Sequence, residues 1–442
     1  MKDITHTISE KIEPIKKDFG IFFTPQWVID FMVGLIDVSL LSGGNLSLLE
    51  PACGVCQFIQ RIRKNRPELY RRFDTRVGVE LNSEVVTYLR DSKLFPDVEL
   101  VNADYLLWET DKKFDVIIGN PPYGIPSLSE HYTIRVDNTT KDRYKKLYET
   151  WYGKYNVYGA FIEKSIKLLK SGGQLIFIVP ATFMILDEFK KLRKFLSING
   201  TTELIYMGSD AFKPEADVTT VVLRFVKNGS GTVFLKDYDK NKIRDVKEEK
   251  NWDGSVITFR TDFTDRLERI CSFKLEDIYK IHISPRTPEI RKNRYVLKQK
   301  LSEKMLPILN GRNLKIGQVL YEPYTGYWIE ESKKTTLRKF FDRPHIVVGL
   351  GFRGNGRIGS AYDYRAYPWM GDVYHLLRKR MLTNLHFDLS EEEVVNYLNS
   401  ELVSRYIKEV FRDITYHLNI SKLKRIPLPK KSELEVAYRE LL

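Results

Sequence analysis

Apolar, β-rich segments alternate with helical patterns from Leu46 to Phe225. This alternation is typical of a doubly wound α/β fold, in which helices cover both faces of a mostly parallel sheet. The last two expected strands have no helix between them, which predicts an antiparallel hairpin at one edge of a seven-stranded sheet. The expected strands, in chain order, are Leu46 to Glu50, Arg76 to Glu80, Val98 to Val101, Phe114 to Gly119, Gln174 to Val179, Glu203 to Met207 and Thr219 to Phe225.

A second domain is expected in the carboxyl-terminal half. The chain has 442 residues, and the segment from Lys227 to Thr258 is polar and charge-dense. Because a chain of this length exceeds one ordinary hydrophobic core, we predict an α/β domain over 1–258, with its core from about residue 19, and a mixed α+β domain over 259–442. In the second domain, His345 to Leu350 and Ile358 to Tyr362 flank a glycine-rich hairpin with Asn355-Gly356 at its turn.

Positive charge is concentrated in the second half of the chain. The net charge is +13, and from Arg260 onward 34 Lys and Arg stand against 23 Asp and Glu, a net charge of +11. A basic half of this kind is typical of a polyanion-binding domain, although a solvated basic surface is the alternative.

Several classes of protein are excluded by composition. The three cysteines, Cys53, Cys56 and Cys271, cannot form a disulfide framework, and the seven scattered histidines give no ligand spacing, so no metal is expected. No run of about 18 apolar residues predicts a membrane span, and Met1 to Ile21 lacks the apolar core of a signal peptide. A cytoplasmic protein without membrane contacts is expected.

The tetrapeptide Asn120-Pro121-Pro122-Tyr123 directly follows the expected strand Phe114 to Gly119. Open α/β sheets bind ligands outside the carboxyl ends of their strands, where this loop emerges. The two prolines fix φ and remove two backbone donors, so the Asn120 side-chain oxygen and the Pro121 carbonyl can hold both protons of an exocyclic amine. Tyr123 offers a ring on which a base can stack. An Asn-Pro turn is the purely structural alternative.

Acidic residues end three successive strands. Glu50 opens the loop Glu50 to Gly54, whose glycine and small side chains let a ligand approach the backbone, and its carboxylate favours a cationic ligand. Glu80 stands where acidic side chains bind ribose hydroxyls, and Asp104 can accept from an adenine amino group beside Tyr105. Each of these carboxylates alone is commonly a strand-end cap. Upstream, Thr24-Pro25 predicts a helix with Thr24 as its N-cap and Pro25 as its first residue.

The order of these motifs resembles the gamma-class amino-methyltransferases of DNA, and more narrowly the TaqI-type adenine-N6 DNA methyltransferases. The similarity continues through Tyr155 to Phe161 and Val179 to Thr182, and into the second half at Leu309 to Lys315, Arg365 to Trp369 and Arg412-Asp413. It covers nearly the whole chain from about Phe19.

The resemblance implies a catalytic first domain, a methyltransferase sheet and S-adenosylmethionine as methyl donor, with S-adenosylhomocysteine as product. It also implies an adenine rotated out of duplex DNA, with Phe212 facing Tyr123 across the base. The implied cofactor-binding residues are Thr24, Glu50, Pro51, Ala52, Cys53, Glu80, Asp104, Tyr105 and Pro122. The implied catalytic residues are Asn120, Pro121, Tyr123 and Phe212.

The second domain resembles the target-recognition domain of that family. Arg353 and Arg357, at the tip of the hairpin, are expected at guanine edges or phosphates, and Lys422, Lys424 and Arg425 at phosphates. Tyr416 lies in the segment Ile414 to His417, which together with the hairpin differs from the family pattern. The family target TCGA is therefore not transferred to this chain.

Alternatives follow from the same residues. Cys56 replaces a second glycine of the family pattern, which bears on cofactor affinity. The same loop can hold the N4 amine of cytosine, and protein-glutamine methyltransferases of release factors also use Asn-Pro-Pro-Tyr. RNA methylation and an inactive DNA-specificity protein are further alternatives. A monomer that acts on double-stranded DNA is expected, with any cognate restriction endonuclease on a separate chain because the motifs begin near residue 22.

Overall fold

The computed structural model describes residues 24–41, 43–127, 134–214, 217–239, 242–353, 356–379 and 386–442. The chain divides into two compact units, Met1–Thr258 and Phe259–Leu442, and each is described by itself. Some residues singled out in the sequence lie outside the described residues: Met1 to Ile21, Phe22, Phe23, Gly354 and Asn355.

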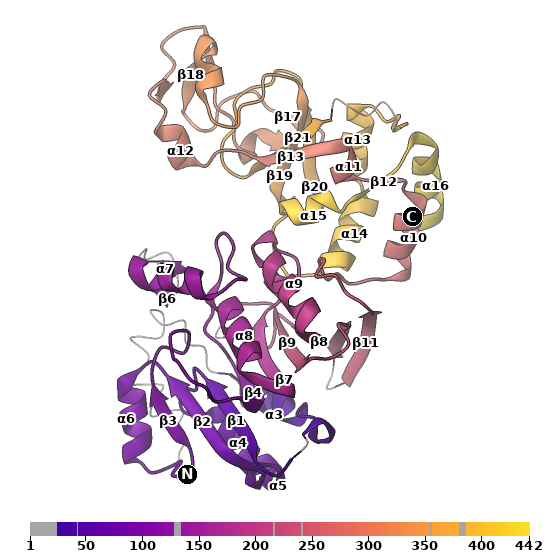
Figure 1. Ribbon diagram of the computed structural model, residues 1–442. Helices are drawn as coiled ribbons and strands as arrows, with labels where there is room; N and C mark the ends of the chain where they lie inside the picture. The colour runs from indigo at the N-terminus through magenta and orange to yellow at the C-terminus, as the bar shows by residue number, and fades with distance from the viewer. Residues whose placement is uncertain are drawn as a thin grey trace. The chain divides into compact units, whose positions relative to one another are not determined.

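A large, mostly parallel sheet forms the centre of the first unit (Figure 1). Its strand order is β11-β10-β8-β9-β7-β4-β1-β2-β3. The strands are β1 (Leu46–Pro51), β2 (Phe73–Glu80), β3 (Glu99–Asn102), β4 (Phe114–Gly119), β7 (Leu169–Pro180), β8 (Gly200–Gly208), β9 (Thr220–Lys227), β10 (Val233–Asp239) and β11 (Lys242–Glu249). The predicted α/β fold is confirmed.

Two strands were not expected. All seven predicted strands are present, but β10 and β11 arise from the polar segment between Lys227 and Thr258, in which no strand is predicted, so the sheet has nine strands among the described residues. The predicted antiparallel pairing of β8 with β9 is confirmed. Its predicted place at the sheet edge is wrong, because β10 adds to β8 in parallel and β11 then pairs with β10.

Helices cover both faces of this sheet. One face packs on α3, α4 and α6 through a continuous apolar core that includes Val28, Ile59, Val116 and Ile118. Figure 1 shows α8 and α9 in front of the sheet, over the opposite face. Every residue of β4 is buried, as the central strand of such a three-layer unit requires. The helices are α3 (Gln26–Gly34), α4 (Gln57–Asn65), α5 (Pro67–Arg71), α6 (Ser83–Asp91), α7 (Asn138–Leu147), α8 (Val157–Leu168) and α9 (Lys190–Asn199).

The remaining elements of the first unit are short. They are β5 (Pro126–Ser127), β6 (Ile134–Arg135) and the 3-10 turns η1 (Val38–Leu40), η2 (Ala181–Met184) and η3 (Asp187–Phe189).

The second unit is a mixed α+β structure around an antiparallel sheet of order β13-β21-β19-β20. Its strands are β13 (Tyr279–Ile283), β21 (Val373–Arg378), β19 (His345–Phe352) and β20 (Ile358–Asp363). The predicted hairpin is confirmed as β19 and β20, whose ladder is irregular between Val348 and Phe352.

Small sheets and short helices complete the second unit. The strands are β12 (Phe273–Lys274), β14 (Val296–Leu297), β15 (Met305–Pro307), β16 (Leu314–Lys315), β17 (Gln318–Val319), β18 (Trp328–Glu330) and β22 (Pro427–Leu428). The helices are α10 (Asp262–Ile270), α11 (Leu275–Ile278), α12 (Thr287–Arg291), α13 (Glu391–Leu398), α14 (Glu401–Phe411), α15 (Ile420–Lys424) and α16 (Lys431–Leu441), with 3-10 turns η4 (Gly311–Asn313) and η5 (Glu331–Thr336).

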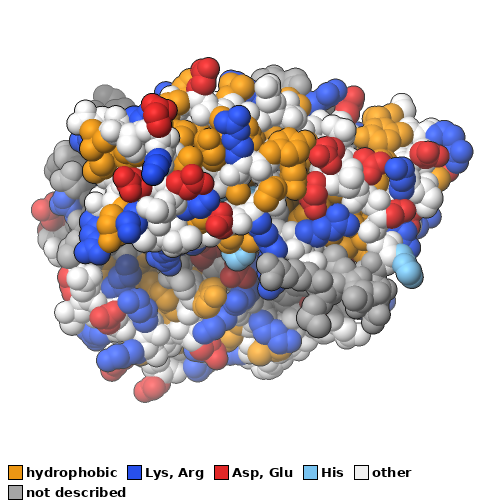
Figure 2. Space-filling view, turned by 90° about the horizontal axis from the view of Figure 1, so that it is seen from above, with side chains coloured by type: hydrophobic (Ala, Val, Ile, Leu, Met, Phe, Trp, Pro, Cys, Tyr) orange, Lys and Arg blue, Asp and Glu red, His pale blue; other side chains and the backbone are white. Residues whose placement is uncertain are grey.

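Charges of both signs are dispersed over the surface that Figure 2 presents, where Lys and Arg side chains are interspersed with acidic and hydrophobic ones. No helix in the described part of the chain is long and apolar enough to cross a membrane.

Candidate active site

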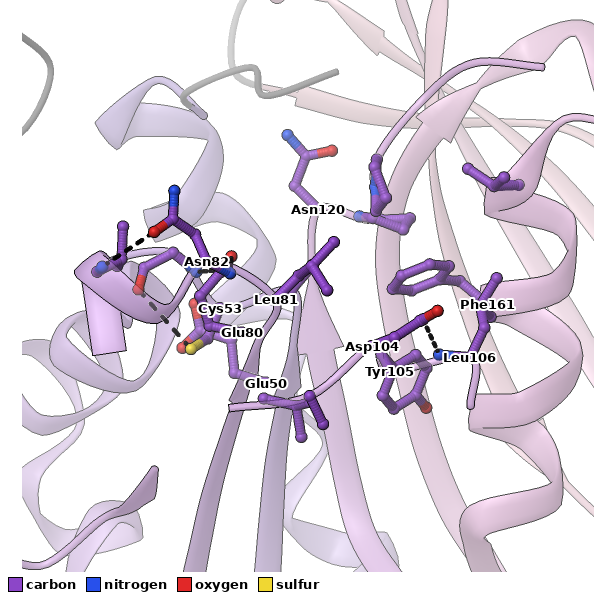
Figure 3. Close-up of a pocket in the computed structure, with 18 of the residues that line it drawn as sticks. Glu50, Cys53, Glu80, Leu81, Asn82, Asp104, Tyr105, Leu106, Asn120 and Phe161 are labelled. Atoms are coloured by element: carbon purple, nitrogen blue, oxygen red, sulfur yellow. Dashed lines mark hydrogen bonds between the residues drawn. The ribbon is translucent and has the colours of Figure 1, made fainter. Parts of the chain in front are cut away.

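A cavity of about 190 Å³ lies in the first unit, lined by the residues that follow β1, β2, β3 and β4. Figure 3 shows Glu50, Glu80, Asp104 and Asn120 around it. Parallel strands end at one edge of the sheet, so residues far apart in the sequence meet here. The lining includes Thr24, Glu50, Ala52, Cys53, Glu80, Asp104, Tyr105, Asn120, Pro121 and Pro122.

The carboxylate of Glu50 closes the loop between β1 and α4. It is buried and accepts hydrogen bonds from the backbone amides of Phe58 (3.2 Å) and Ile59 (2.9 Å), in the first turn of α4. Burial raises its pKa to about 8, against the lowering effect of those two amides. A cationic ligand would therefore stabilise the ionised form of Glu50.

Three residues with positive φ shape the same loop: Ala52 (49°), Gly54 (51°) and Cys56 (57°). The left-handed conformation is unfavourable for alanine and cysteine, so tertiary contacts must hold them there. Cys56, which stands where the family pattern has a glycine, is buried. Its sulfur would lie 3.2 Å from a β-carbon added at Gly78. The neighbouring strand β2 therefore makes room for both loop cysteines by having glycine at position 78, since the Cys53 sulfur would lie 3.0 Å from the same carbon.

Glu80, at the end of β2, joins its own strand end to this loop. One carboxylate oxygen accepts from the Gly54 amide (2.9 Å) and the other from the Asn82 amide (2.9 Å). Burial raises the pKa of Glu80. Each oxygen retains a second lone pair, so the carboxylate can also accept from a ligand hydroxyl.

The carboxylate of Asp104 is held by a backbone amide two residues further along the chain and by a helix that was not predicted. The carboxylate accepts from the Leu106 amide (2.9 Å), drawn dashed in Figure 3, and from the Tyr144 hydroxyl (2.6 Å). Tyr144 lies on α7 and lines the cavity. The sequence analysis missed it, although Asp137, which caps α7 by accepting from the Thr140 amide, is a recognisable helix start. Tyr105 lines the cavity beside Asp104, and its hydroxyl hydrogen-bonds Ser165 (2.9 Å).

Thr24 has a different place from the one predicted. Helix α3 begins at Gln26, its N-cap is Pro25, and no side chain caps it. The prediction of Thr24 as N-cap is wrong because the Pro25 carbonyl accepts the first helical bonds, from Val28 and Ile29. The Thr24 hydroxyl instead accepts a hydrogen bond from the Asn120 side-chain nitrogen (3.0 Å). This contact orients the carboxamide of Asn120 at the cavity.

Tyr123 and Phe212 are brought together, but not as parallel faces. Their ring centroids are 6.4 Å apart at an interplanar angle of 89°, and their exposed fractions are 6 % and 1 %. The Tyr123 hydroxyl donates to the Ile178 carbonyl (2.9 Å). The two rings therefore contact each other edge to face, and in this conformation no base fits between them. Pro51 ends β1 and is buried, and it is not among the residues that line the cavity.

The expected DNA-binding residues of the second unit differ in exposure. Arg357, Tyr416 and Lys424 are exposed, whereas Arg353 and Arg425 are partly buried. Lys422 is 1 % exposed, its ammonium donates to the Thr415 carbonyl (2.7 Å), and burial lowers its pKa to about 8. The structure thus does not place Lys422 where a phosphate could reach it.

No metal centre is evident in the part of the chain that the structure describes, where no three His, Cys, Asp or Glu residues gather in a ligand-like group.

Two families match separate parts of the chain. The Eco57I restriction-modification methylase family matches residues 57–212, and the TaqI-like C-terminal specificity domain matches residues 306–428. The first match contains most of the residues that line the cavity, from Gln57 onward, but not Thr24, Glu50 or the loop up to Val55. The second match contains the β19–β20 hairpin.

Individual proteins show the same relationship. The chain is 38% identical to the type II methyltransferase M.TthHB8I of Thermus thermophilus over 95% of this chain and 93% of that protein. It is 29% identical to the type II restriction enzyme and methyltransferase RM.Eco57I of Escherichia coli, over 63% of this chain and 23% of that protein. A solved structure of the type ISP restriction-modification enzyme LlaGI, a nuclease-deletion mutant with a DNA substrate mimic, shares the fold. It has a TM-score of 0.59 and 14% identity over 100% of this chain and 56% of that one.

The Thermus relative is matched over nearly its full length, and a methylase family and a specificity-domain family each match one of the two units. The chain therefore belongs to the type II methyltransferases of restriction-modification systems.

Proposed function

We propose that this protein transfers a methyl group from S-adenosylmethionine to N6 of an adenine that is rotated out of duplex DNA at a specific sequence. The observation that carries the proposal is the loop from Asn120 to Pro122 at the edge of a cavity whose walls include Glu50, Glu80 and Asp104. The oxygen atoms that could accept from an amine therefore lie next to a cavity that could bind a cationic nucleoside.

The cavity suits S-adenosylmethionine chemically. The buried Glu50 carboxylate fits the methionine ammonium or the sulfonium charge, and Glu80 has lone pairs for ribose hydroxyls. Asp104 and Tyr105 adjoin each other on the wall that would receive the adenine. When bound, the cofactor supplies an electrophilic methyl group and leaves as S-adenosylhomocysteine.

Asn120 and Pro121 would activate the amine. The lone pair of adenine N6 is delocalised into the ring, so the nitrogen is a poor nucleophile. Hydrogen bonds from its two protons to the Asn120 side-chain oxygen and the Pro121 carbonyl favour a pyramidal nitrogen with an available lone pair. As the bond from nitrogen to the methyl carbon forms and the bond from that carbon to sulfur breaks, these acceptors would stabilise the positive charge on nitrogen. The nitrogen then loses a proton to water, which restores the neutral methylated amine.

The hydrogen bond from Asn120 to Thr24 supports this role. With its nitrogen engaged by the Thr24 hydroxyl, the carboxamide directs its oxygen to the other side, as an acceptor for substrate. Tyr123 and Phe212 stand beside the loop as the aromatic pair for the flipped base. Since the rings are now edge to face, entry of the base requires them to part.

The second unit is proposed as the recognition domain, with Arg353, Arg357, Tyr416, Lys424 and Arg425 as DNA contacts. Its match to a specificity-domain family and the basic charge of this half support the assignment. We further propose that the enzyme acts as a cytoplasmic monomer on double-stranded DNA and protects it from an endonuclease on a separate chain.

Product analysis tests the proposal directly. The purified protein is incubated with radiolabelled S-adenosylmethionine and mixed-sequence duplex DNA, the DNA is digested to nucleosides, and the labelled nucleoside is identified. N6-methyladenine is the expected product. Labelled N4-methylcytosine would reassign the base.

Unlabelled DNA would contradict the function, and calorimetry with S-adenosylmethionine would then separate two explanations. Cofactor binding without transfer to DNA would direct the search to RNA and to protein glutamine. No cofactor binding would indicate an inactive DNA-specificity protein.

A further inference from the structure

A groove of about 960 Å³ opens in the second unit, where several segments far apart in the sequence meet. They include the segment before β21, the turn η4 with the following β16, the end of β19, and the segment before α15. The backbone amide of Leu418 donates to the Leu350 carbonyl (2.8 Å), which joins the last two. The polar residues that line the groove include Asn310, Arg312, Lys315, Tyr324, Arg353, Asp372 and His417.

The groove unites positions that the sequence singled out for a different reason. The hairpin from Gly351 to Arg357 and the segment Ile414 to His417 both differ from the family pattern. One residue of each, Arg353 and His417, lines the groove. The groove therefore brings together residues from both of these segments.

The side chain of Arg353 lies flat on a shelf made by two glycines. A β-carbon at Gly349 would lie 2.8 Å from an Arg353 terminal nitrogen, and one at Gly359 would collide with its Nε. Gly349 and Gly359 belong to the adjacent strands β19 and β20. The absence of side chains at both positions therefore leaves room for the guanidinium in the wall of the groove.

Among the described residues, this guanidinium has no carboxylate partner, in contrast to two other partly buried arginines. Arg61 pairs with Asp30, and Arg224 pairs with Glu203. Within the described residues, no carboxylate lies within 4.0 Å of Arg353, and its buried Nε has no hydrogen-bond acceptor. One terminal nitrogen donates a long bond of 3.5 Å to the Gly311 carbonyl. A partly buried guanidinium without a carboxylate partner, at the wall of a groove, is suited to a planar, bidentate acceptor that reaches its terminal nitrogens.

We propose that Arg353 reads a guanine of the recognition sequence through the O6 and N7 acceptors of that base. The inference rests on the proposed function, because it assumes a duplex DNA substrate. A guanine edge fits better than a phosphate, because the planar fork of an arginine matches the paired O6 and N7 acceptors, and because Arg353 is partly buried in the wall of a groove whereas Arg357 is exposed.

The experiment uses base analogues in the natural recognition sequence. The methylated sequence is first mapped on genomic DNA treated with the wild-type enzyme. Duplexes are then made in which each guanine is replaced in turn by 7-deazaguanine, which loses the N7 acceptor. Methylation rates are measured for the wild type, Arg353→Ala, Arg353→Lys and Arg269→Ala, a control that removes an exposed arginine of α10 outside the groove.

The wild type and Arg269→Ala are expected to lose about tenfold or more in rate at one guanine position. Arg353→Ala and Arg353→Lys are expected to be slow on the natural duplex and to lose nothing further at that position. Arg353→Lys retains the positive charge, so it separates recognition of the base from electrostatic attraction to DNA. Thermal melting of each variant shows whether the fold is intact.

Three results would overturn the inference while leaving the proposed function intact. The first is that the Arg353 variants are still slowed by 7-deazaguanine at every guanine position at which the wild type is slowed. The second is a mapped recognition sequence that contains no guanine. The third is that the Arg353 variants are slower than the wild type by the same factor on all duplexes, which would identify a phosphate contact. A wild type that methylates no duplex would overturn the proposed function, and the inference with it.

Discussion

The carboxamide of Asn120 has two roles, one for its nitrogen and one for its oxygen. Its nitrogen donates to Thr24, and its oxygen is proposed to accept from the substrate amine. Asn120→Ala removes the acceptor for developing charge, so kcat should fall by roughly 100-fold or more. DNA binding, measured by fluorescence anisotropy, should be retained. Near-normal turnover in this variant would remove Asn120 from the mechanism.

Thr24 is predicted to be a positioning residue for that carboxamide. Thr24→Val keeps the shape of the side chain but removes the acceptor of the 3.0 Å hydrogen bond. Because one hydrogen bond contributes about 1 kcal/mol, kcat should fall by roughly fivefold. Thr24→Ser is the matched control, since it restores the hydroxyl and should restore most of the rate. If both variants turn over equally, Thr24 does not act through Asn120.

The pKa of Glu50 makes cofactor affinity depend on pH. Burial raises this pKa to about 8, so at pH 6 the free site holds a protonated carboxyl group. A cationic cofactor favours the ionised form, hence binding releases a proton, and affinity should increase as pH rises from 6 to 7.5. Calorimetry should show this dependence for the wild type and a flatter one for Glu50→Gln. A parallel pH profile in the variant would assign the proton to another group, such as Glu80.

The sequence could predict the residues of the site whose position follows from a strand end. Glu50 and Glu80 lie at the ends of β1 and β2, and Asp104 and Asn120 follow β3 and β4, so parallel strands deliver all four residues to one cavity. The hydrogen bond from Asn120 to Thr24 joins residues that are far apart in the chain, so no local pattern encodes it. Burial of Lys422 under the segment that contains Thr415 is likewise a tertiary effect.

Among the elements, helix α7 closes one side of the cavity through Tyr144. Its hydroxyl donates to the Asp104 carboxylate, so Tyr144→Phe releases one of the two contacts that hold this group. The dissociation constant of S-adenosylmethionine should increase by roughly 5- to 10-fold. Tyr152→Phe, which changes an exposed tyrosine, serves as control and should bind normally. Equal affinity in both variants would show that α7 does not shape the cofactor site.

Strands β10 and β11 show why part of the fold was not predictable. Their segment contains many charged residues and few long apolar runs, so it reads as a polar linker. In the sheet, only the alternate residues Val233 and Leu235 of β10 are buried, and β11 is mostly exposed. Such strands form because an existing sheet edge offers hydrogen bonds, and the signal for them lies in their partner β8 rather than in themselves.

For the molecule as a whole, the net charge of +13 predicts DNA binding that weakens with salt. Charges of both signs are mixed over the face in Figure 2, so single cations must be tested individually. Lys424 is exposed, and Lys424→Ala should reduce the slope of log K against log salt by about one. Lys422→Ala is the matched control, because a buried ammonium releases no counterion. Equal changes of slope in both variants would contradict this distinction.

The outermost strand of the large sheet also has a consequence for the purified protein at high concentration. Six of the eight residues of β11 are charged, and the strand carries both signs along its length. An unpaired strand edge is a template on which a second chain can add, and charged side chains on that edge oppose such growth. The polar composition that conceals β11 in the sequence therefore protects the folded enzyme from aggregation through its longest sheet.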